Sequence, residues 1–368
     1  MRMVEWKKLG EVCELERGVR VIKKDLQEEG LIPVYQNSLT PLGYFDKSNY
    51  PANTPFVICA GAAGEIGFCN KPFWAADDCT CILCSSSVNK KFIYYCLLVK
   101  QHTLKSQVRK ASVPRLSKEV IGKLIVPIPS MSEQERVVGI LDTFISSIDN
   151  LKQQIAQRRK QYEYYRDQLL DLEGKEGVEM KTLGEIGEFI RGNGIQKSDF
   201  VEDGFGCIHY GQIHAKYGFS ATETISKIRE DLYRRCKKAQ KGDVVLATTS
   251  EDAEGVAKPF VWLGEDEVAV SGDAFIYHHN QIGKFMGYQF LTHKFMQFKV
   301  KNATGAKVVR ISGDNLAKFK VALPPLSEQQ RIVSILDTFE ASIQNLEAQL
   351  SQREKQYEYY RNKLLTFE

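Results

Sequence analysis

The chain has 368 residues, a formal net charge of +4, and 43% hydrophobic and 26% charged residues. This composition is ordinary for a soluble globular protein of two or three domains, and the small basic surplus permits nucleic-acid binding without proving it. A membrane-spanning protein is excluded because no run of about eighteen consecutive apolar residues occurs. The first residues contain no apolar signal-peptide core, so we expect a cytoplasmic protein.

The first globular segment, residues 1–130, is predicted to be mixed α/β. Its expected strands are 55–60 and 80–85, and its expected helix is 91–100. Gly61, Gly64 and Gly67 follow the first of these strands, but their spacing differs from that of a dinucleotide-binding loop, so a turn between strands is expected.

Cysteines are concentrated in this segment, which holds seven of the nine. The closely spaced Cys79, Cys81 and Cys84 suggest a zinc site, yet a second matching pair of ligands at a usable distance is missing. They also lie in an apolar run typical of a buried strand. We therefore interpret them as small buried thiols and expect no bound metal.

A long helix is predicted for residues 131–175 and again for 326–368. Pro127, Pro129, Pro324 and Pro325 precede the two helices and end the strands before them. Ser132 with Glu135, and Ser327 with Gln330, form capping-box patterns. The apolar residues that follow repeat at alternating spacings of three and four, which is typical of a coiled-coil seam. The predicted seam residues are Leu141, Phe144, Ile148, Leu151 and Ile155 in the first helix and Leu336, Phe339, Ile343, Leu346 and Leu350 in the second.

One polar residue interrupts each seam at the same place, Arg158 and Arg353, and we interpret both as residues that set the pairing of the helices. About 40 residues at 1.5 Å each give a helix of roughly 60 Å. Tyr164 and Tyr359 lie off the seam. They either dock a partner or only cover the coil, and the sequence leaves both interpretations open.

The second globular segment, residues 176–325, repeats the mixed α/β pattern. Its expected strands are 243–248 and 274–278, and its expected helix is 284–299.

An internal repeat relates the two halves of the chain. Residues 124–173 align without gaps to residues 319–368, with roughly 29 of 50 positions identical. The beginnings also match, since Arg17-Gly18 corresponds to Arg191-Gly192, whereas the middles diverge. The fold class expected is therefore two mixed α/β domains, each followed by a long α-helix, with the two helices forming an antiparallel coiled coil with pseudo-twofold symmetry.

Motifs for catalysis are missing from the sequence. There is no phosphate-binding loop of the G-K-[ST] type. The six histidines show neither metal-ligand spacing nor an arrangement with a nucleophile. We therefore expect a chain that is not itself an enzyme.

The segment Leu323-Pro324-Pro325-Leu326-Ser327-Glu328-Gln329-Gln330-Arg331-Ile332 resembles the conserved-region helix of the specificity subunits of type I restriction–modification enzymes. Ile128-Pro129-Ser130-Met131-Ser132-Glu133-Gln134-Glu135-Arg136 repeats it at mid-chain. The resemblance implies that 1–130 and 176–325 are target-recognition domains and that 131–175 and 326–368 are conserved spacer helices. Each recognition domain would recognise one half of a split double-stranded DNA target, and the helices would set the gap between the halves.

The resemblance also implies partner subunits that carry the chemistry. Two modification subunits would methylate adenine with S-adenosylmethionine, and restriction subunits would use ATP and Mg²⁺ for translocation and cleavage. No cofactor is then expected in this chain. Two other interpretations remain: a coiled-coil scaffold with two protein-binding heads, and a methyltransferase that acts without partners.

Candidate DNA-binding residues are polar side chains able to contact base edges and cations able to contact phosphates. In the first segment they are Gln36, Asn37, Ser38, Lys105, Arg109, Lys110 and Arg115. In the second they are Tyr210, Gln212, His214, Lys216, Lys301, Asn302, Thr304, Lys307 and Arg310. Arg115 and Arg310 are preferred because both copies keep them beside a basic stretch.

Overall fold

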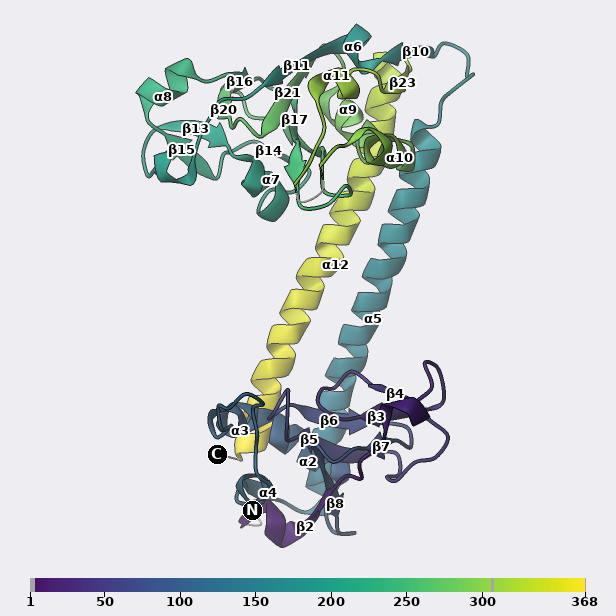
Figure 1. Cartoon of the computed structure of the whole chain (residues 1–368), viewed down its shortest axis with the longest axis vertical. Helices are drawn as coiled ribbons and strands as arrows, with labels where there is room; N and C mark the ends of the chain where they lie inside the picture. The colour runs from purple at the N-terminus through teal and green to yellow at the C-terminus, as the bar shows by residue number, and fades with distance from the viewer. Residues whose placement is uncertain (1–3, 306–307, 368) are drawn as a thin grey trace. The chain divides into compact units, whose positions relative to one another are not determined.

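The computed structural model describes residues 4–305 and 308–367, and the chain divides into two compact units. Unit 1 contains Met1–Gln153 and Glu347–Glu368, and unit 2 contains Gln154–Leu346. The long helices are α5 (Met131–Leu170) and α12 (Leu326–Thr366). Each unit therefore combines one globular segment with part of both long helices (Figure 1).

Unit 1 is built on an antiparallel sheet in the order β2-β8-β5-β6. A second sheet has the order β4-β3-β7, and β1 pairs with β9. The strands are β1 (Glu5–Lys8), β2 (Cys13–Arg17), β3 (Ile32–Tyr35), β4 (Gly43–Phe45), β5 (Thr54–Ile58), β6 (Ile66–Cys69), β7 (Trp74–Ala75), β8 (Cys79–Cys84) and β9 (Ile125–Ile128). The helices are α1 (Leu9–Val12), α2 (Lys90–Val99), α3 (Gln101–Ser106) and α4 (Lys118–Gly122). Helix α2 lies against β5 and β6.

Unit 2 repeats this plan with a larger sheet in the order β11-β21-β17-β19-β14. A second sheet has the order β12-β15-β13-β20-β16, and β10-β23 and β18-β22 form separate pairs. The strands are β10 (Glu179–Thr182), β11 (Gly187–Arg191), β12 (Phe200–Val201), β13 (Phe205–Ile208), β14 (Ser220–Ala221), β15 (Ser226–Ile228), β16 (Lys238–Ala239), β17 (Val244–Ala247), β18 (Thr249–Ser250), β19 (Lys258–Trp262), β20 (Val268–Val270), β21 (Ala274–His279), β22 (Val309–Arg310) and β23 (Lys320–Leu323). The helices are α6 (Leu183–Ile186), α7 (Tyr210–Ala215), α8 (Glu230–Arg235), α9 (Gly283–Gln289), α10 (His293–Asn302) and α11 (Gly313–Leu316).

The four strands expected from the sequence are confirmed as β5, β8, β17 and β21. They form because short apolar runs of β-branched and aromatic residues suit a buried sheet: every residue of β5 and β17 is buried. The helix expected at 284–299 is wrong as a single element, because it is interrupted after α9. Thr292 is extended there, and its hydroxyl accepts a hydrogen bond from the Phe295 nitrogen (3.2 Å), which begins α10.

The long helices begin differently from the predicted capping boxes. Helix α5 starts at Met131, so Ser132 already lies inside its first turn. A buried glutamine makes the stabilising contacts instead: Gln134 Nε2 donates to the Pro129 carbonyl (2.9 Å), and its Oε1 accepts from the Asn89 nitrogen (2.8 Å). In unit 2, Gln329 Nε2 donates to the Pro324 carbonyl (3.0 Å), and its Oε1 accepts from the Ile282 nitrogen (3.2 Å). Each glutamine therefore joins the start of a long helix to the residue that precedes α2 or α9.

All ten residues of the predicted seam are buried or half-buried. In unit 1 the Phe144 ring stacks on Tyr360 with centroids 5.4 Å apart, and the Arg353 guanidinium lies 5.7 Å from the same Phe144 ring. In unit 2 the Phe339 ring stacks on Tyr165 (5.5 Å), and Arg158 lies 5.9 Å from that Phe339 ring. The two arginines that interrupt the seam thus cover a phenylalanine of the opposite helix, where cation–π attraction favours them.

The glycine turn, the cysteines of β8 and the two tyrosines outside the seam can each be compared with their predictions. Gly61 and Gly64 adopt positive φ angles of 80° and 88° in the turn between β5 and β6, whereas Gly67 lies within β6. Cys79 and Cys81 are fully buried in β8, also as expected. Tyr164 and Tyr359 are 61% and 58% exposed, and their role as docking residues stays a prediction.

Within the described parts of the chain, no helix combines the length and apolar character needed to cross a bilayer.

Candidate nucleic-acid interface

Three separate stretches of unit 1 meet at the turn between β5 and β6. The Ala62 nitrogen donates to the Asn37 carbonyl (2.9 Å), so the loop after β3 lies against this turn. The Gly61 nitrogen donates to the Pro114 carbonyl (3.2 Å), so the segment before α4 lies there too. The candidates at 36–38 and those at 105–115, far apart in sequence, are thereby brought together.

An exposed hairpin carries three of these candidates. Arg109 and Arg115 face each other, with the Arg109 nitrogen donating to the Arg115 carbonyl (2.9 Å) and the Arg115 nitrogen to the Arg109 carbonyl (3.2 Å). Every residue from 109 to 115 is exposed, and so is Lys105 in α3. Arg109, Lys110 and Arg115 thus place three cations on one loop whose backbone is held by hydrogen bonds.

Unit 2 has an equivalent hairpin between Thr304 and Arg310. The Thr304 nitrogen donates to the Arg310 carbonyl and the Arg310 nitrogen to the Thr304 carbonyl, both at 2.8 Å. Strand β22 pairs with β18, which places Thr249 opposite Arg310, as Ala60 lies opposite Arg115 in unit 1. In both hairpins the two paired residues are six positions apart in the sequence. Lys307, a further candidate, lies outside the described residues.

Helix α7 brings one further candidate of the second segment, His214, to the same place. His214 Nε2 lies 3.1 Å from the Thr249 carbonyl, and the Tyr210 nitrogen donates to Ser271 Oγ (2.8 Å). Tyr210 and His214 are half-buried, and Lys216 is exposed just beyond the helix. His214 therefore lies next to β18, the strand that pairs with Arg310.

Some candidates are held by contacts within the protein. Gln212 is 6% exposed and its Nε2 donates to Ser226 Oγ (2.7 Å), so its choice as a surface residue was wrong: it lies on the inner side of α7. Gln36 donates to Asp78 Oδ2 (3.4 Å), and Ser38 Oγ donates to the Thr40 carbonyl (3.1 Å). Asn302 Nδ2 donates to the Phe298 carbonyl (2.8 Å) within α10, whereas Lys301 is exposed.

Lys299 is a residue that the sequence did not single out. It is 4% exposed, and its Nζ donates to the Val256 carbonyl (2.9 Å) and to the Glu254 carbonyl. These carbonyls belong to the loop that follows β18, so the lysine joins this loop to α10. Burial lowers the pKa of Lys299 to about 8, against an ordinary value of 10.5.

We expect the free energy of unfolding of unit 2 to depend on pH through the protonation of Lys299. The unfolded chain keeps this proton up to about pH 10.5 and the folded chain loses it near pH 8, so the unfolded state binds more protons in between. Relative to Lys299→Met, the free energy of unfolding of the wild type should therefore rise between pH 8 and 10, by up to about 1.4 kcal/mol per pH unit. Urea unfolding at several pH values measures this, with Lys301→Met as a matched surface control. Parallel pH profiles for the wild type and Lys299→Met would contradict the expectation.

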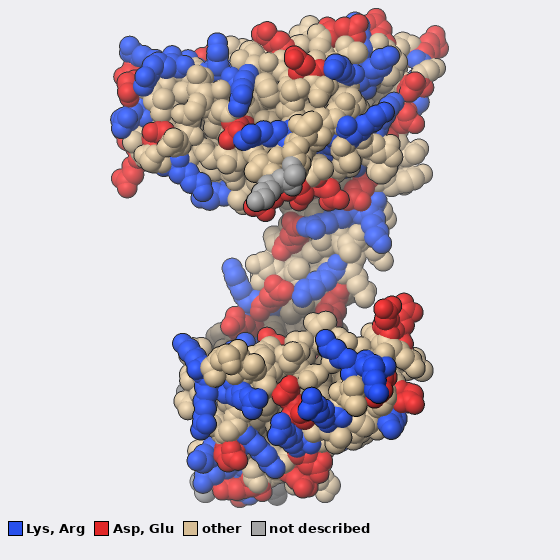
Figure 2. Space-filling view, viewed as in Figure 1, with Lys and Arg blue, Asp and Glu red and all other residues tan. Residues whose placement is uncertain are grey.

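Net charge alone does not mark the interface. Figure 2 shows lysine and arginine side chains intermingled with aspartate and glutamate on the visible face of each unit. Recognition therefore has to depend on particular cations held in particular places, as in the two hairpins.

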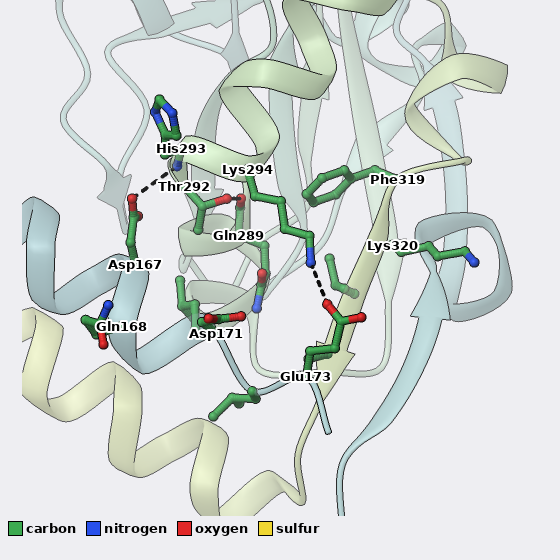
Figure 3. Close-up of a pocket in the computed structure, with 14 residues that line it drawn as sticks. Asp167, Gln168, Asp171, Glu173, Gln289, Thr292, His293, Lys294, Phe319 and Lys320 are labelled. Atoms are coloured by element: carbon green, nitrogen blue, oxygen red, sulfur yellow. Dashed lines mark hydrogen bonds and ion pairs between the residues drawn. The ribbon is translucent and has the colours of Figure 1, made fainter. Parts of the chain in front are cut away.

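A cavity of about 250 Å³ in unit 2 lies between the end of α5, the start of α10 and β23. Figure 3 shows Lys294 paired with Glu173 (3.1 Å) and the His293 nitrogen donating to Asp167 (3.3 Å). Gln289 is 4% exposed and its Nε2 has no partner among the described residues. Ion pairs and hydrogen bonds here join the end of α5 to the second globular segment, and the lining carries three carboxylates. This cavity is consequently a packing junction rather than part of the basic interface.

Across residues 4–305 and 308–367, no three histidine, cysteine, aspartate or glutamate side chains lie close enough to hold a metal ion. His278 Nδ1 lies 2.8 Å from Asp243 Oδ1, and burial lowers the pKa of the neighbouring His279 to about 4. These histidines belong to the sheet of unit 2 and lie on β21.

Comparison with known proteins gives consistent matches. The family model described as "Type I restriction modification DNA specificity domain" matches residues 2–158 and again residues 175–354. The specificity subunit of the type I restriction enzymes EcoR124I and EcoR124II from Escherichia coli is 30% identical over 392 residues, covering 99% of this chain and 94% of that protein.

Solved structures agree on the fold. The S subunit of a type I restriction–modification system from Mycoplasma genitalium superimposes with a TM-score of 0.64 at 16% identity, covering 99% of this chain and 97% of the other. A chain from a structure of type I restriction–modification complex assembly gives 0.61 at 15% identity, covering 99% and 98%. The chain therefore belongs to the family of type I restriction–modification DNA specificity subunits, with one specificity domain in each half.

Proposed function

We propose that this chain is the sequence-specific DNA-binding subunit of a type I restriction–modification system. Each recognition domain recognises one half of a bipartite double-stranded target, and the complex directs adenine methylation or DNA cleavage to that target. One observation carries the proposal: two different globular segments each hold an exposed arginine, Arg115 or Arg310, by the same pair of main-chain hydrogen bonds, beside loops that differ between them. Repeated cations suit the uniform phosphate backbone, and differing loops suit different base sequences.

The chemistry is assigned to partner subunits in the cytoplasm. Two modification subunits carry S-adenosylmethionine, restriction subunits carry ATP and Mg²⁺, and this chain holds no cofactor and performs no catalysis. The turn after β5 supports this assignment, because its glycines shape a turn that receives main-chain contacts from Asn37 and Pro114 instead of leaving its amides open to a cofactor phosphate.

Mapping of methylated adenines tests the function directly. Expression of the chain with its modification subunits in a cell without DNA methylation should place methyl groups at one bipartite sequence. A chimera that receives residues 1–130 from a relative of different specificity should change only one half of that sequence.

A gel-shift experiment distinguishes the scaffold alternative. The full chain with its modification subunits should retard a duplex that contains the mapped target at concentrations that leave a scrambled duplex free. A scaffold with two protein-binding heads would bind both duplexes equally or neither. A methyltransferase that acts without partners would transfer methyl groups as the isolated chain, and we expect no such transfer.

A further inference from the structure

Each globular segment ends the first strand of its main sheet with an arginine followed by a glycine. In unit 1, Arg17 Nε donates to the Asp77 carbonyl (2.6 Å). In unit 2, Arg191 Nε donates to the Gly272 carbonyl (2.9 Å). Both acceptors lie two residues before the neighbouring strand, β8 or β21, so the same contact is made twice.

The glycine after each arginine allows the chain to approach this neighbouring segment closely. A Cβ atom at Gly18 would lie 2.2 Å from the Ala76 carbonyl oxygen, and one at Gly192 would lie 2.3 Å from the Ser271 carbonyl oxygen. No other residue type fits at such a separation. The position from which each arginine side chain starts is thus determined by the backbone.

The outer part of each guanidinium remains available. The Nε–H bond to a carbonyl leaves two terminal NH₂ groups, and the Arg17 side chain is 67% exposed. Its nearest carboxylate oxygen, Asp77 Oδ2, is 4.0 Å away, which is too long for a hydrogen bond. Arg191 is also exposed, and among the described residues no carboxylate lies within 4.0 Å of its guanidinium.

These arginines lie beside the basic hairpins. Arg17 and Arg115 line the same concavity of about 210 Å³, together with Lys118. Asp77 and Asp78 line it too, but Asp78 accepts the hydrogen bond from Gln36. In unit 2, Asp273 follows the carbonyl that binds Arg191, and its Oδ1 accepts from Thr249 (3.2 Å), which lies opposite Arg310. In unit 1 the carbonyl-anchored arginine thus lies beside the hairpin arginine, and in unit 2 the contact between Asp273 and Thr249 joins the segments that carry the corresponding two arginines.

We propose that Arg17 and Arg191 are phosphate anchors, each binding one backbone phosphate of the DNA next to the recognition hairpin. This inference rests on the proposed function. Two domains that recognise different base sequences share only one feature of their ligand, the repeating phosphate backbone, so a contact that is identical in two otherwise divergent domains matches that feature. A guanidinium whose Nε–H is already hydrogen-bonded has few rotamers left. Little side-chain entropy is therefore lost when its two NH₂ groups, which lie in one plane, bind a phosphate.

The salt dependence of DNA binding tests this proposal. The full chain with its modification subunits is titrated with a duplex containing the mapped target, and with a scrambled duplex, across a series of salt concentrations. Each phosphate contact contributes about 0.9 to the slope of log K against log salt. Arg17→Gln and Arg191→Gln should each reduce the slope by about that amount, and affinity should fall by the same factor on both duplexes.

Matched variants complete the experiment. Lys7→Gln and Lys181→Gln remove the same charge at corresponding strand positions that are ion-paired with Glu5 and Glu179, and should leave the slope unchanged. Arg17→Lys keeps the charge and should keep the wild-type slope, but it loses the Nε–H that bonds the Asp77 carbonyl and should bind DNA more weakly than the wild type. An unchanged slope for Arg17→Gln and Arg191→Gln, or wild-type affinity for Arg17→Lys, overturns the inference. A wild-type complex that does not prefer its target overturns the proposed function instead.

Discussion

Replacement of Arg310 by alanine should weaken DNA binding by the assembled complex about tenfold to a hundredfold, the effect of losing a contact worth roughly 1–3 kcal/mol. The backbone at this residue is held by two 2.8 Å hydrogen bonds to Thr304 and by the pairing of β22 with β18. Alanine preserves all of these main-chain contacts. The change therefore removes the side chain and leaves the hairpin in place.

Because Arg115 occupies the same place in unit 1, the loss at Arg310 should be similar on target and non-target duplexes. A filter-binding titration at moderate salt measures it, with Arg115→Ala as the counterpart and Lys181→Ala as a control lysine that is ion-paired with Glu179. Unchanged affinity for Arg310→Ala would remove the residue from the interface. A loss confined to duplexes altered in one half-site would instead assign Arg310 to base recognition.

The long helices and the main strands were predictable because their signals are local. The three-four spacing of apolar residues requires no knowledge of the partner helix, and all ten predicted seam residues are buried or half-buried. The same holds for β5 and β8, whose apolar runs are short and clearly bounded. The internal repeat strengthened these predictions, because the same pattern of the long helix occurs in both copies.

The errors have a common physical origin in contacts between residues far apart in sequence. The serines at 132 and 327 match a capping box, but the helix begins earlier because Gln134 reaches the backbone of Asn89, 45 residues away. Gln212 has the composition of a base-contacting residue, and only the position of β15 shows that it faces inward. The sequence did not indicate that Lys299 is buried, because its burial depends on the loop after β18, whose position the sequence does not reveal.

Only part of the candidate site was predictable, because the rest depends on contacts between residues far apart in sequence. Sequence comparison of the two copies found Arg115 and Arg310, and it also matched Arg17 with Arg191. It could not show that Arg17 and Arg115 line one concavity, because that proximity depends on the pairing of Ala60 with Arg115. Repetition identifies which residues share a role, and the fold shows what that role is.

Asp337→Ala should destabilise unit 2 by about 2–3 kcal/mol, because one carboxylate there has two partners. Lys284 Nζ lies 2.8 Å from Asp337 Oδ2, and the Tyr288 hydroxyl donates to Asp337 Oδ1 at 2.6 Å. Tyr288 is fully buried, and burial together with this carboxylate raises the pKa of its hydroxyl. Alanine removes the acceptor of a buried hydroxyl and a counter-ion of a half-buried ammonium, and Glu340 is the carboxylate that remains near both. Unit 1 has the same arrangement, with Asp142 accepting from Lys91 and Tyr95.

Urea unfolding followed by tryptophan fluorescence can isolate this effect. The chain has three tryptophans, and Trp6→Phe with Trp74→Phe leaves only the buried Trp262 as a reporter in unit 2. In that background, Asp337→Asn keeps an acceptor for Tyr288 and should cost less than half as much as Asp337→Ala. Tyr288→Phe should cost about 1 kcal/mol, and its effect should become smaller once Asp337 is alanine, because the hydroxyl then has no hydrogen bond to Asp337 to lose. If the effects of Tyr288→Phe and Asp337→Ala simply add, the carboxylate does not stabilise α12 against α9 through this hydrogen bond, and the repeated aspartate requires another explanation.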